Sequence, residues 1–374
     1  MLTSSLARVT RKNMAWARPG LIIYLIARLA TLVFVLIADL VDHQGLVAHL
    51  SVWDGKWFLR ATQHGWPQHL PMVHGHVAAN TTAFFPFFPF VLRVFSLGER
   101  LSPAVVGLVI SALTGMVAVV CVGLLAKEIG TVEQARRATV LFALSPGSFV
   151  FSLIYSEGFL ITFLALGLLA LVRRRWWWAG IFGALATITS PVGLAFVVTC
   201  AVCSLVAIIK HRNWSSLVAP ILAPLGFIGW MGYLWAHTGH FDAWRLTERG
   251  GWDSYPSLLY PVRIITQFLF NPLSPTLTGY MLLIGTIVSA LGLWIVVKDR
   301  QPLALVAYAT SALLLFAVAA PVGLRPRFIM QIFPMTIAVA ARWSGWRYRA
   351  LMATSVLLLI VMTFEEISSW AMFP

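Results

Sequence analysis

One carboxylate stands among tryptophans and cations in the stretch SVWDGKWFLR near the N-terminus. Asp54 is a candidate general base, because transfer of a group to a hydroxyl needs a proton acceptor beside the attacking oxygen. Lys56 and Arg60 are candidate partners for a departing phosphate, and in a helix they would share one face. Trp53 and Trp57 can stack on sugar rings or lie at the level of lipid headgroups. The alternative is an interfacial amphipathic helix whose start Asp54 caps.

A second motif is the aromatic run TAFFPFFPF. We expect Pro86 and Pro89 to prevent a helix here, and the run is too short to span a membrane. Phe84, Phe85 and Pro86 would then lie in the interface or re-enter it shallowly and line a groove for a lipid tail. The alternative is a simple aromatic anchor.

Two further groups of residues have types suited to binding a charged substrate. Tyr155, Ser156 and Glu157 form one turn, in which Glu157 can bond a sugar hydroxyl, orient the candidate base or cap the next helix. Arg325 and Arg327 stand beside an expected helix start, which predicts a phosphate site. The alternative for both arginines is snorkelling to lipid headgroups.

The composition predicts the kind of fold that must position these residues. Of 374 residues 59% are hydrophobic and 11% are charged, with a mean hydropathy of +0.84. Soluble domains average about 25% charged residues, so the chain is expected to be an all-α polytopic membrane protein. Its net charge of +14 does not indicate nucleic acid, because the basic residues occupy short segments between apolar runs. Three cysteines in apolar segments are expected to pack between helices.

About eleven transmembrane helices are expected in a single domain, 1–374. A first extracytoplasmic loop, 41–101, would carry interfacial helices and the catalytic residues. A second large loop, 237–275, would hold an interfacial helix near 267–271. The expected spans are 19–40, 102–126, 138–154, 158–172, two short helices within 176–209 that meet at a break at 189–193, then 216–235, 276–297, 302–320, 328–341 and 350–367.

Orientation follows from the basic residues, which concentrate in the segments that would be cytoplasmic if the N-terminus is cytoplasmic. These segments include Arg8, Arg11 and Lys12 and the stretches 127–137 and 173–175. Most acids and histidines then fall on the extracytoplasmic side of the plasma membrane. Sugar nucleotides are cytoplasmic, so a sugar-transferring enzyme there would need a lipid-linked donor.

The order of these motifs resembles the phosphatidylinositol-glycan class V mannosyltransferases, the GPI mannosyltransferase 2 family, and their bacterial relatives. The resemblance rests on Trp53-Asp54, Ala83 to Pro86, Ser145-Pro146-x-Ser148, Tyr155-Ser156-Glu157, Ala186-Thr187 and Pro191-x-Gly193. It implies a GT-C type membrane glycosyltransferase that inverts at the anomeric carbon. The donor would be a polyprenyl-phosphate sugar, usually mannose, and the acceptor a glycolipid, a lipid-linked molecule or a protein.

This sequence departs from the resemblance at one place. Relatives often carry an arginine where this chain has Ser190, so Arg325 or Arg327 would have to contact the donor phosphate instead. A divalent metal, Mg or Mn, is left open as a cofactor, and His69, His74 and His76 are a weaker metal motif. The rival functions are a transporter or flippase, which usually shows internal repeats that this chain lacks, and a non-catalytic membrane subunit.

Overall fold

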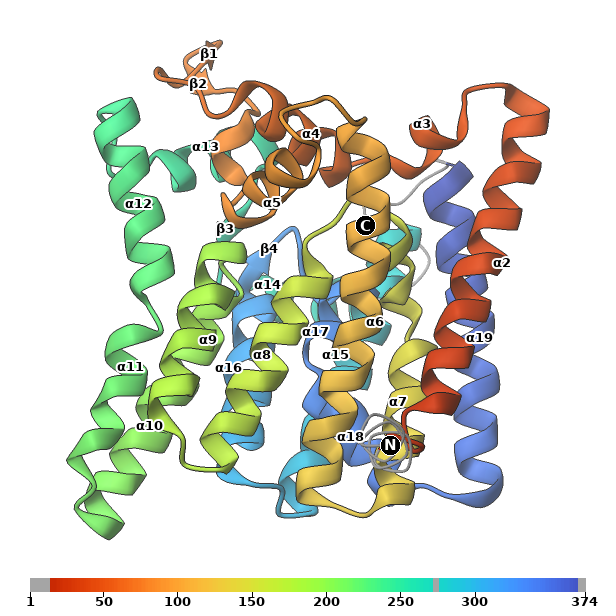
Figure 1. The fold of residues 1–374 in the computed structure, drawn as a ribbon, viewed down its shortest axis with the longest axis vertical. Coiled ribbons are helices and arrows are strands. Elements are labelled where there is room, and N and C mark those ends of the chain that lie inside the picture. Colours follow the sequence, from red (N-terminus) through yellow and green to blue (C-terminus); the bar gives the residue numbers. More distant parts are fainter. Residues whose placement is uncertain (1–13, 272–275, 369–374) are drawn as a thin grey trace, which may run out of the picture.

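The computed structural model describes residues 14–271 and 276–368 as a bundle of helices with two very short strand pairs (Figure 1). The α-helices are α2 Arg18–Asp42, α3 Leu46–Leu50, α4 Asp54–His64, α5 Phe87–Phe95, α6 Pro103–Ile129, α7 Val132–Ala143, α8 Glu157–Val172, α9 Trp176–Thr189, α10 Gly193–His211, α11 Val218–Leu222, α12 Leu225–Thr238, α13 Ala243–Trp252, α14 Tyr260–Phe270, α15 Leu277–Lys298, α16 Leu303–Val318, α17 Pro326–Gln331, α18 Phe333–Arg342 and α19 Gly345–Ser368. The 3₁₀ helices are η1 Thr81–Ala83, η2 Pro146–Ser152 and η3 Trp214–Leu217.

Both strand pairs are antiparallel and contain two residues in each strand. β1 Met72–Val73 pairs with β2 His76–Val77 in a hairpin inside the first long loop. β3 Tyr255–Pro256 pairs with β4 Ala319–Ala320, which joins two segments more than sixty residues apart. This second pair connects the loop after α13 to the segment that leads into α17.

The two ends of the bundle differ in what they carry. Figure 1 places α3, α4, α5 and α13 at one end and the start of α2 at the other. The turns after α6, α8, α10, α15 and α18 lie at the same end as the start of α2. Three of them contain arginines (173–175, Arg212 and Arg300), and Lys127 and Arg342 lie in the last turns of α6 and α18. The expected basic segments therefore share one face. Arg8, Arg11 and Lys12 lie outside the described residues.

The apolar helices support a multi-pass membrane protein. Within the described residues, six helices are long and apolar enough to cross a membrane, or seven if the bent pair of η2 and α8 is one span. The expected total of eleven stays a prediction, because several expected spans are represented by shorter apolar helices such as α16 and α18. Residues 272–275 of the second large loop lie outside the described residues.

The broken segment was predicted correctly, because α9 ends at Thr189 and α10 begins at Gly193. The expected span 138–154 was wrong. α7 ends at Ala143, and η2 begins at Pro146, whose ring cannot continue the preceding helix. η2 and α8 then meet at an angle of 119°.

The expectation that prolines exclude a helix from 84–90 was also wrong. α5 begins at Phe87 and contains Pro89 in its first turn. A backbone N–H in the first turn has no partner within the helix, so proline removes no hydrogen bond there. The expected span 328–341 is interrupted as well, because α17 ends at Gln331 and α18 restarts with Pro334 near its beginning.

Glycine permits the close helix contact that places the start of α8. A Cβ on Gly158 would lie 2.7 Å from the backbone nitrogen of Gly115 in α6, so the two helices touch backbone to backbone. The turn before α8 is fastened to the same helix, because the Ser111 hydroxyl donates to the Tyr155 carbonyl (3.0 Å) and accepts from the Tyr155 N–H (3.1 Å). Glu157, the first residue of α8, is held in place by these contacts.

Candidate active site

A cavity of about 390 Å³ opens between the first loop, the break between α9 and α10, α13 and α17. Its volume falls in the range of small-molecule sites, roughly 300–1,000 Å³. Apolar and aromatic side chains form most of its wall, and the charged residues among its lining are Asp54, Glu157, Arg245, Glu248 and Arg327. The cavity therefore combines an apolar wall with a few converging charges.

Arg327 joins the two acids that the sequence analysis singled out. Its Nη1 lies 2.7 Å from Asp54 Oδ2, and its Nε lies 3.1 Å from Glu157 Oε1. The side chains of Arg327 and Glu157 are 14% and 7% exposed, and that of Asp54 is 26% exposed. Asp54 is thus the member of this trio that is most accessible to a molecule in the cavity.

The start of α4 directs Asp54 toward this trio. Trp53 precedes the helix with φ 51° and ψ −120°, and Asp54 is the first helical residue. Gly55 packs against the turn before α8, where a Cβ would lie 3.5 Å from Ile154 Cβ. No side chain caps the start of α4, so helix capping does not describe Asp54 in this structure.

The cations nearest to Asp54 in sequence do not line this cavity. Lys56 and Arg60 are exposed, and Arg60 stacks over the ring of Trp57 at 5.1 Å. Steps of two and six residues rotate a side chain by about 200° and 240° around a helix axis, so both point away from the side that carries Asp54. Trp57 stacks on Phe84 with ring centroids 6.0 Å apart, which makes it part of the wall's support.

The aromatic and Tyr-Ser-Glu motifs do meet at the cavity. Phe84, Phe85 and Ser156 line it directly, and Pro86 precedes the first residue of α5. Tyr155 is buried, and the Arg327 guanidinium lies 5.0 Å from its ring centroid. This cation–π contact with Tyr155 helps to keep the Arg327 guanidinium in position.

Arg325 is brought near Arg327 but lines a different pocket. It is 8% exposed and contributes to a pocket with α14 and α15 instead of the cavity that contains Asp54. Ser190, where the resemblance leads us to expect an arginine, lines the same cavity as Arg327. Of the two predicted substitutes, Arg327 is therefore the one that shares a cavity with Ser190.

A second glycine sets the position of Arg327. Gly147 in η2 lies directly against the backbone of Pro326, and a Cβ on it would be 2.8 Å from the Arg327 Cα. Arg28 in α2 fixes η2 from the other side by donating to the Ser148 carbonyl and to the Ser152 hydroxyl (3.0 Å). The half-buried Arg28 thus has hydrogen-bond partners inside the protein, as a charge within an apolar helix needs.

Burial and charge act in opposite directions on the pKa of Arg327. Burial lowers it, but the carboxylates of Asp54 and Glu157 raise it further, so the net shift is upward. The guanidinium therefore stays charged and is balanced by two acids. A negatively charged phosphate would compete with these acids for the same cation.

Glu248 in α13 is a cavity residue that the sequence reasoning missed. Burial, followed by the charge of Asp54, raises the pKa of Glu248 to about 7. The sequence offered one indication of Glu248, namely its place in the predicted second loop with other acids. No spacing in the sequence relates Glu248 to Asp54. Other lining residues not singled out include Trp244, Arg245, Gln331 and Phe328.

The cavity acids do not fit a divalent metal in this arrangement. Asp54 and Glu157 direct oxygens toward the Arg327 guanidinium, whose positive charge opposes a cation there. Among the described residues, one group has His, Asp or Glu ligand atoms within 4.8 Å of one another, namely Asp39, Asp42 and His49. Metal dependence stays a prediction.

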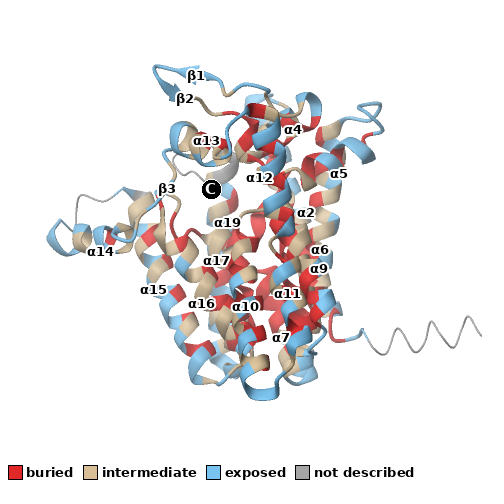
Figure 2. Ribbon diagram, turned by 90° about the vertical axis from the view of Figure 1, so that its left-hand side faces the viewer, coloured by how far each residue is buried: buried red, intermediate tan, exposed pale blue. Residues whose placement is uncertain are grey.

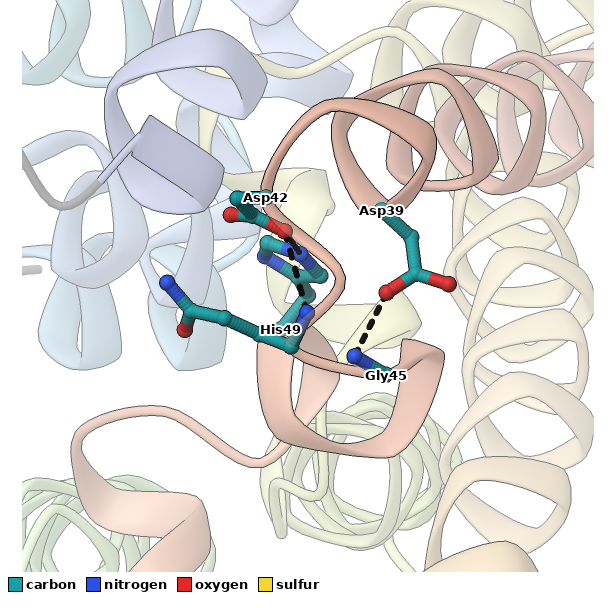
Figure 3. A network of polar contacts seen from close by, with 5 residues as sticks. Asp39, Asp42, Gly45 and His49 are labelled. Carbon is teal, nitrogen blue, oxygen red and sulfur yellow. Dashed lines mark hydrogen bonds and ion pairs between the residues drawn. The ribbon is translucent and has the colours of Figure 1, made fainter.

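Figure 3 shows that this group fastens the turn between α2 and α3. Asp39 Oδ1 accepts from the Gly45 N–H at 2.5 Å, and Asp42 Oδ1 lies 3.0 Å from His49 Nε2. None of the three lines the cavity with Asp54. These contacts hold the loop that leads to α4, and this structural role is enough to account for the group.

The comparisons with known proteins bear on this site. The model of the family described as Mannosyltransferase (PIG-V) matches residues 25–220. The chain belongs to this family. The match includes the segments that supply Asp54, the Phe84-Phe85-Pro86 motif and Glu157, and it ends before the segment that supplies Arg327.

Two curated members are similar in sequence. GPI alpha-1,6-mannosyltransferase 2 of Cricetulus griseus is 31% identical over 169 residues, which are 41% of this chain and 31% of that protein. The Mus musculus protein of the same name is 30% identical over 158 residues, 38% of this chain and 29% of that protein. The chain thus matches about three-tenths of the length of these relatives.

A solved structure with a similar fold is that of a bacterial membrane protein. The crystal structure of ArnT from Cupriavidus metallidurans bound to undecaprenyl phosphate has a TM-score of 0.56 at 13% identity, over 93% of this chain and 64% of that chain. At this level of identity the likeness shows a shared helical fold, in agreement with the expected all-α architecture, and nothing about the reaction.

Proposed function

We propose that this chain is a membrane mannosyltransferase that moves mannose from a polyprenyl-phosphate donor to a lipid, glycolipid or protein acceptor. The observation that carries the proposal is the arrangement of Asp54, Arg327 and Glu157 at one wall of a largely apolar cavity. Membership of a mannosyltransferase family supports the reaction class. The ArnT structure with undecaprenyl phosphate supports a lipid-phosphate donor.

In the proposed reaction, the acceptor hydroxyl attacks the anomeric carbon from the face opposite the phosphate. A new glycosidic C–O bond forms while the bond from that carbon to the phosphate oxygen breaks, so the configuration inverts. Asp54 takes the hydroxyl proton, and the polyprenyl phosphate leaves with the electron pair. Phe84 and Phe328 line the cavity and offer apolar surfaces to the sugar ring.

Arg327 links donor binding to the release of the base. In the structure its guanidinium is paired with Asp54. The donor phosphate would draw this cation toward itself and so free the Asp54 carboxylate for the acceptor hydroxyl, while Glu157 keeps the guanidinium in place. The base would therefore be fully available only when the donor is bound.

The proposed topology places this reaction outside the cytoplasm. We infer about eleven spans in the plasma membrane, a cytoplasmic N-terminus and an extracytoplasmic active site. The basic turns at the end opposite α4 support this orientation through the positive-inside rule. Labelling of single cysteines at His74 and Arg300 with a membrane-impermeant thiol reagent tests it, because only the cysteine at His74 should react in intact cells.

The test of the reaction is Asp54→Asn in the purified full chain, supplied with polyprenyl-phosphate mannose and a membrane lipid extract as acceptor. We expect transfer to fall by about 10²–10⁴, the usual contribution of a general base. Lys56→Gln, two residues away, is the matched control and should stay near the wild-type rate. Activity of Asp54→Asn within about threefold of wild type would sink the catalytic role.

A further inference from the structure

A second pocket lies beside the candidate active site, on the far side of the β3–β4 pair. Its volume is about 370 Å³, and it is bounded by α14, the start of α15 and the segment between β4 and α17. Tyr255 of β3 lines both this pocket and the cavity of Asp54. The short strand pair is therefore the partition between the two spaces.

The charges that line this pocket favour an anion. Arg325 is buried at its inner wall, and Arg263 of α14 is exposed at its rim. Asp253, also exposed, is the acid among the lining residues. Gln267 and Thr278 add neutral hydrogen-bonding groups. Burial and the nearby Arg327 lower the pKa of Arg325, so an anion beside Arg325 would offset an unfavourable environment.

The helix that forms the outer wall has the character of an interfacial helix. Figure 2 shows α14 projecting sideways from the bundle beside α15, at the same end as β3 and α13. Leu269 and Phe270 of α14 are 71% and 79% exposed, and Leu258, two residues before the helix, is 83% exposed. Apolar side chains this exposed next to a basic pocket are typical of a helix that lies in the lipid headgroup region.

The phosphate of a sugar donor does not suit this second pocket. That phosphate is bonded to the reacting carbon, so it must lie in the same cavity as Asp54. The β3–β4 pair, in which Tyr255 faces Ala320 and Pro256 faces Ala319, stands between the two spaces. The occupant should therefore carry a phosphate of its own and an apolar part that remains in the bilayer.

We propose that this pocket binds the phosphodiester headgroup of an anionic membrane phospholipid, with Arg325 and Arg263 contacting the phosphate. The acyl chains lie along the exposed apolar residues of α14. This inference does not depend on glycosyl transfer, and binding can be measured without turnover. It also assigns α14 a role as the outer wall of a lipid site.

The test is lipid binding to the purified full chain in detergent micelles, measured by native mass spectrometry with phosphatidylglycerol and phosphatidylcholine of the same chain length. We expect phosphatidylglycerol to bind more tightly than phosphatidylcholine. Arg325→Gln should weaken this binding about tenfold or more, because a charge-assisted bond to a buried cation is lost. Arg263→Gln, at the exposed rim, should weaken it about two- to fivefold.

Arg93→Gln is the matched control, because Arg93 is an exposed arginine on α5 and lines neither space. If Arg325→Gln does not fold, Arg263→Glu decides, since reversing the charge of an exposed residue should reduce binding while the thermal unfolding midpoint stays constant. Equal binding of both lipids, or unchanged binding in the Arg263 variants, would overturn the proposal. Displacement of phosphatidylglycerol by an equal concentration of inorganic phosphate would show a site for free phosphate instead and would also overturn it.

Discussion

Two regions offer cations to Asp54, and they differ in distance along the chain. Lys56 and Arg60 belong to the same helix as Asp54, yet both are exposed and lie outside the lining of the cavity. Arg327 comes from α17, more than 270 residues later, and its Nη1 lies 2.7 Å from the carboxylate. Proximity in sequence therefore does not decide which of the predicted cations lies beside Asp54.

The difference has a simple geometric origin. A helix distributes neighbouring residues around its axis, so residues two or six positions apart face different directions. Arg327 is placed by packing, because Gly147 allows η2 to touch the backbone that carries it and Arg28 fixes η2. The following predictions test whether the distant cation, and not the local ones, serves the site.

Arg327→Gln should have the largest effect of these changes. The variant leaves Asp54 and Glu157 without their shared cation and removes the proposed phosphate partner, so transfer should fall by about 10²–10³. Initial rates of mannose transfer measure this loss. Arg327→Lys keeps the charge but not the two-pronged geometry, and an intermediate rate is expected. A rate near wild type for Arg327→Gln would return the phosphate role to Lys56 or Arg60.

Gly147→Ala should act on the same cation from a distance. The added methyl group would collide with the Pro326 backbone and push Arg327 away from the acids. Since a displacement of about 1 Å can cost about 100-fold, we expect transfer to fall by about 10- to 100-fold. Gly229→Ala is the control, because a Cβ there meets nothing within 4 Å. Equal rates in the two variants would show that η2 does not position Arg327.

Glu248→Gln should change how the stability of the fold depends on pH, because folding brings this acid into the cavity. The folded-state pKa of Glu248, about 7, lies above its ordinary value of 4.5, so its ionisation destabilises the fold progressively as pH rises from about 4.5 through 7. Glutamine mimics the protonated acid. We expect a small difference between the unfolding midpoints at pH 5 and a midpoint about 2–4 °C higher for the variant at pH 8.

Thermal unfolding at the two pH values checks this prediction. Glu99→Gln is a suitable control, because Glu99 is an exposed acid that does not line the cavity, and this change should leave the pH dependence as in wild type. The same midpoint difference between Glu248→Gln and wild type at pH 5 and pH 8 would contradict the raised pKa.

The double change Lys56→Gln and Arg60→Gln should have the smallest effect. Both side chains are exposed, and Arg60 contacts Trp57 instead of the acids. We expect transfer within about threefold of wild type, since exposed charges contribute about 1 kcal/mol or less. A loss comparable with that of Arg327→Gln would mean that α4 turns toward the donor when it binds.

Several features of the fold and the site were predictable because they depend on local composition. Hydropathy alone predicted a multi-pass helical protein, and Thr189 to Gly193 predicted the break between α9 and α10 correctly. The prediction of a continuous span over 138–154 was wrong because Pro146 interrupts the helix despite the apolar pattern. The helix at α5 was missed because proline is tolerated in the first turn.

The sequence by itself determined the chemical types: an acid in an aromatic loop, a Tyr-Ser-Glu turn and two distant arginines, in an order that resembles a mannosyltransferase family. Only the tertiary structure decided which of them meet. Arg327 was separated from Arg325, Lys56 and Arg60, and Glu248 was added to the cavity. The physical reason is that pairing of charges depends on backbone contacts between distant helices, such as those at Gly147 and Gly158, and no local pattern encodes these contacts.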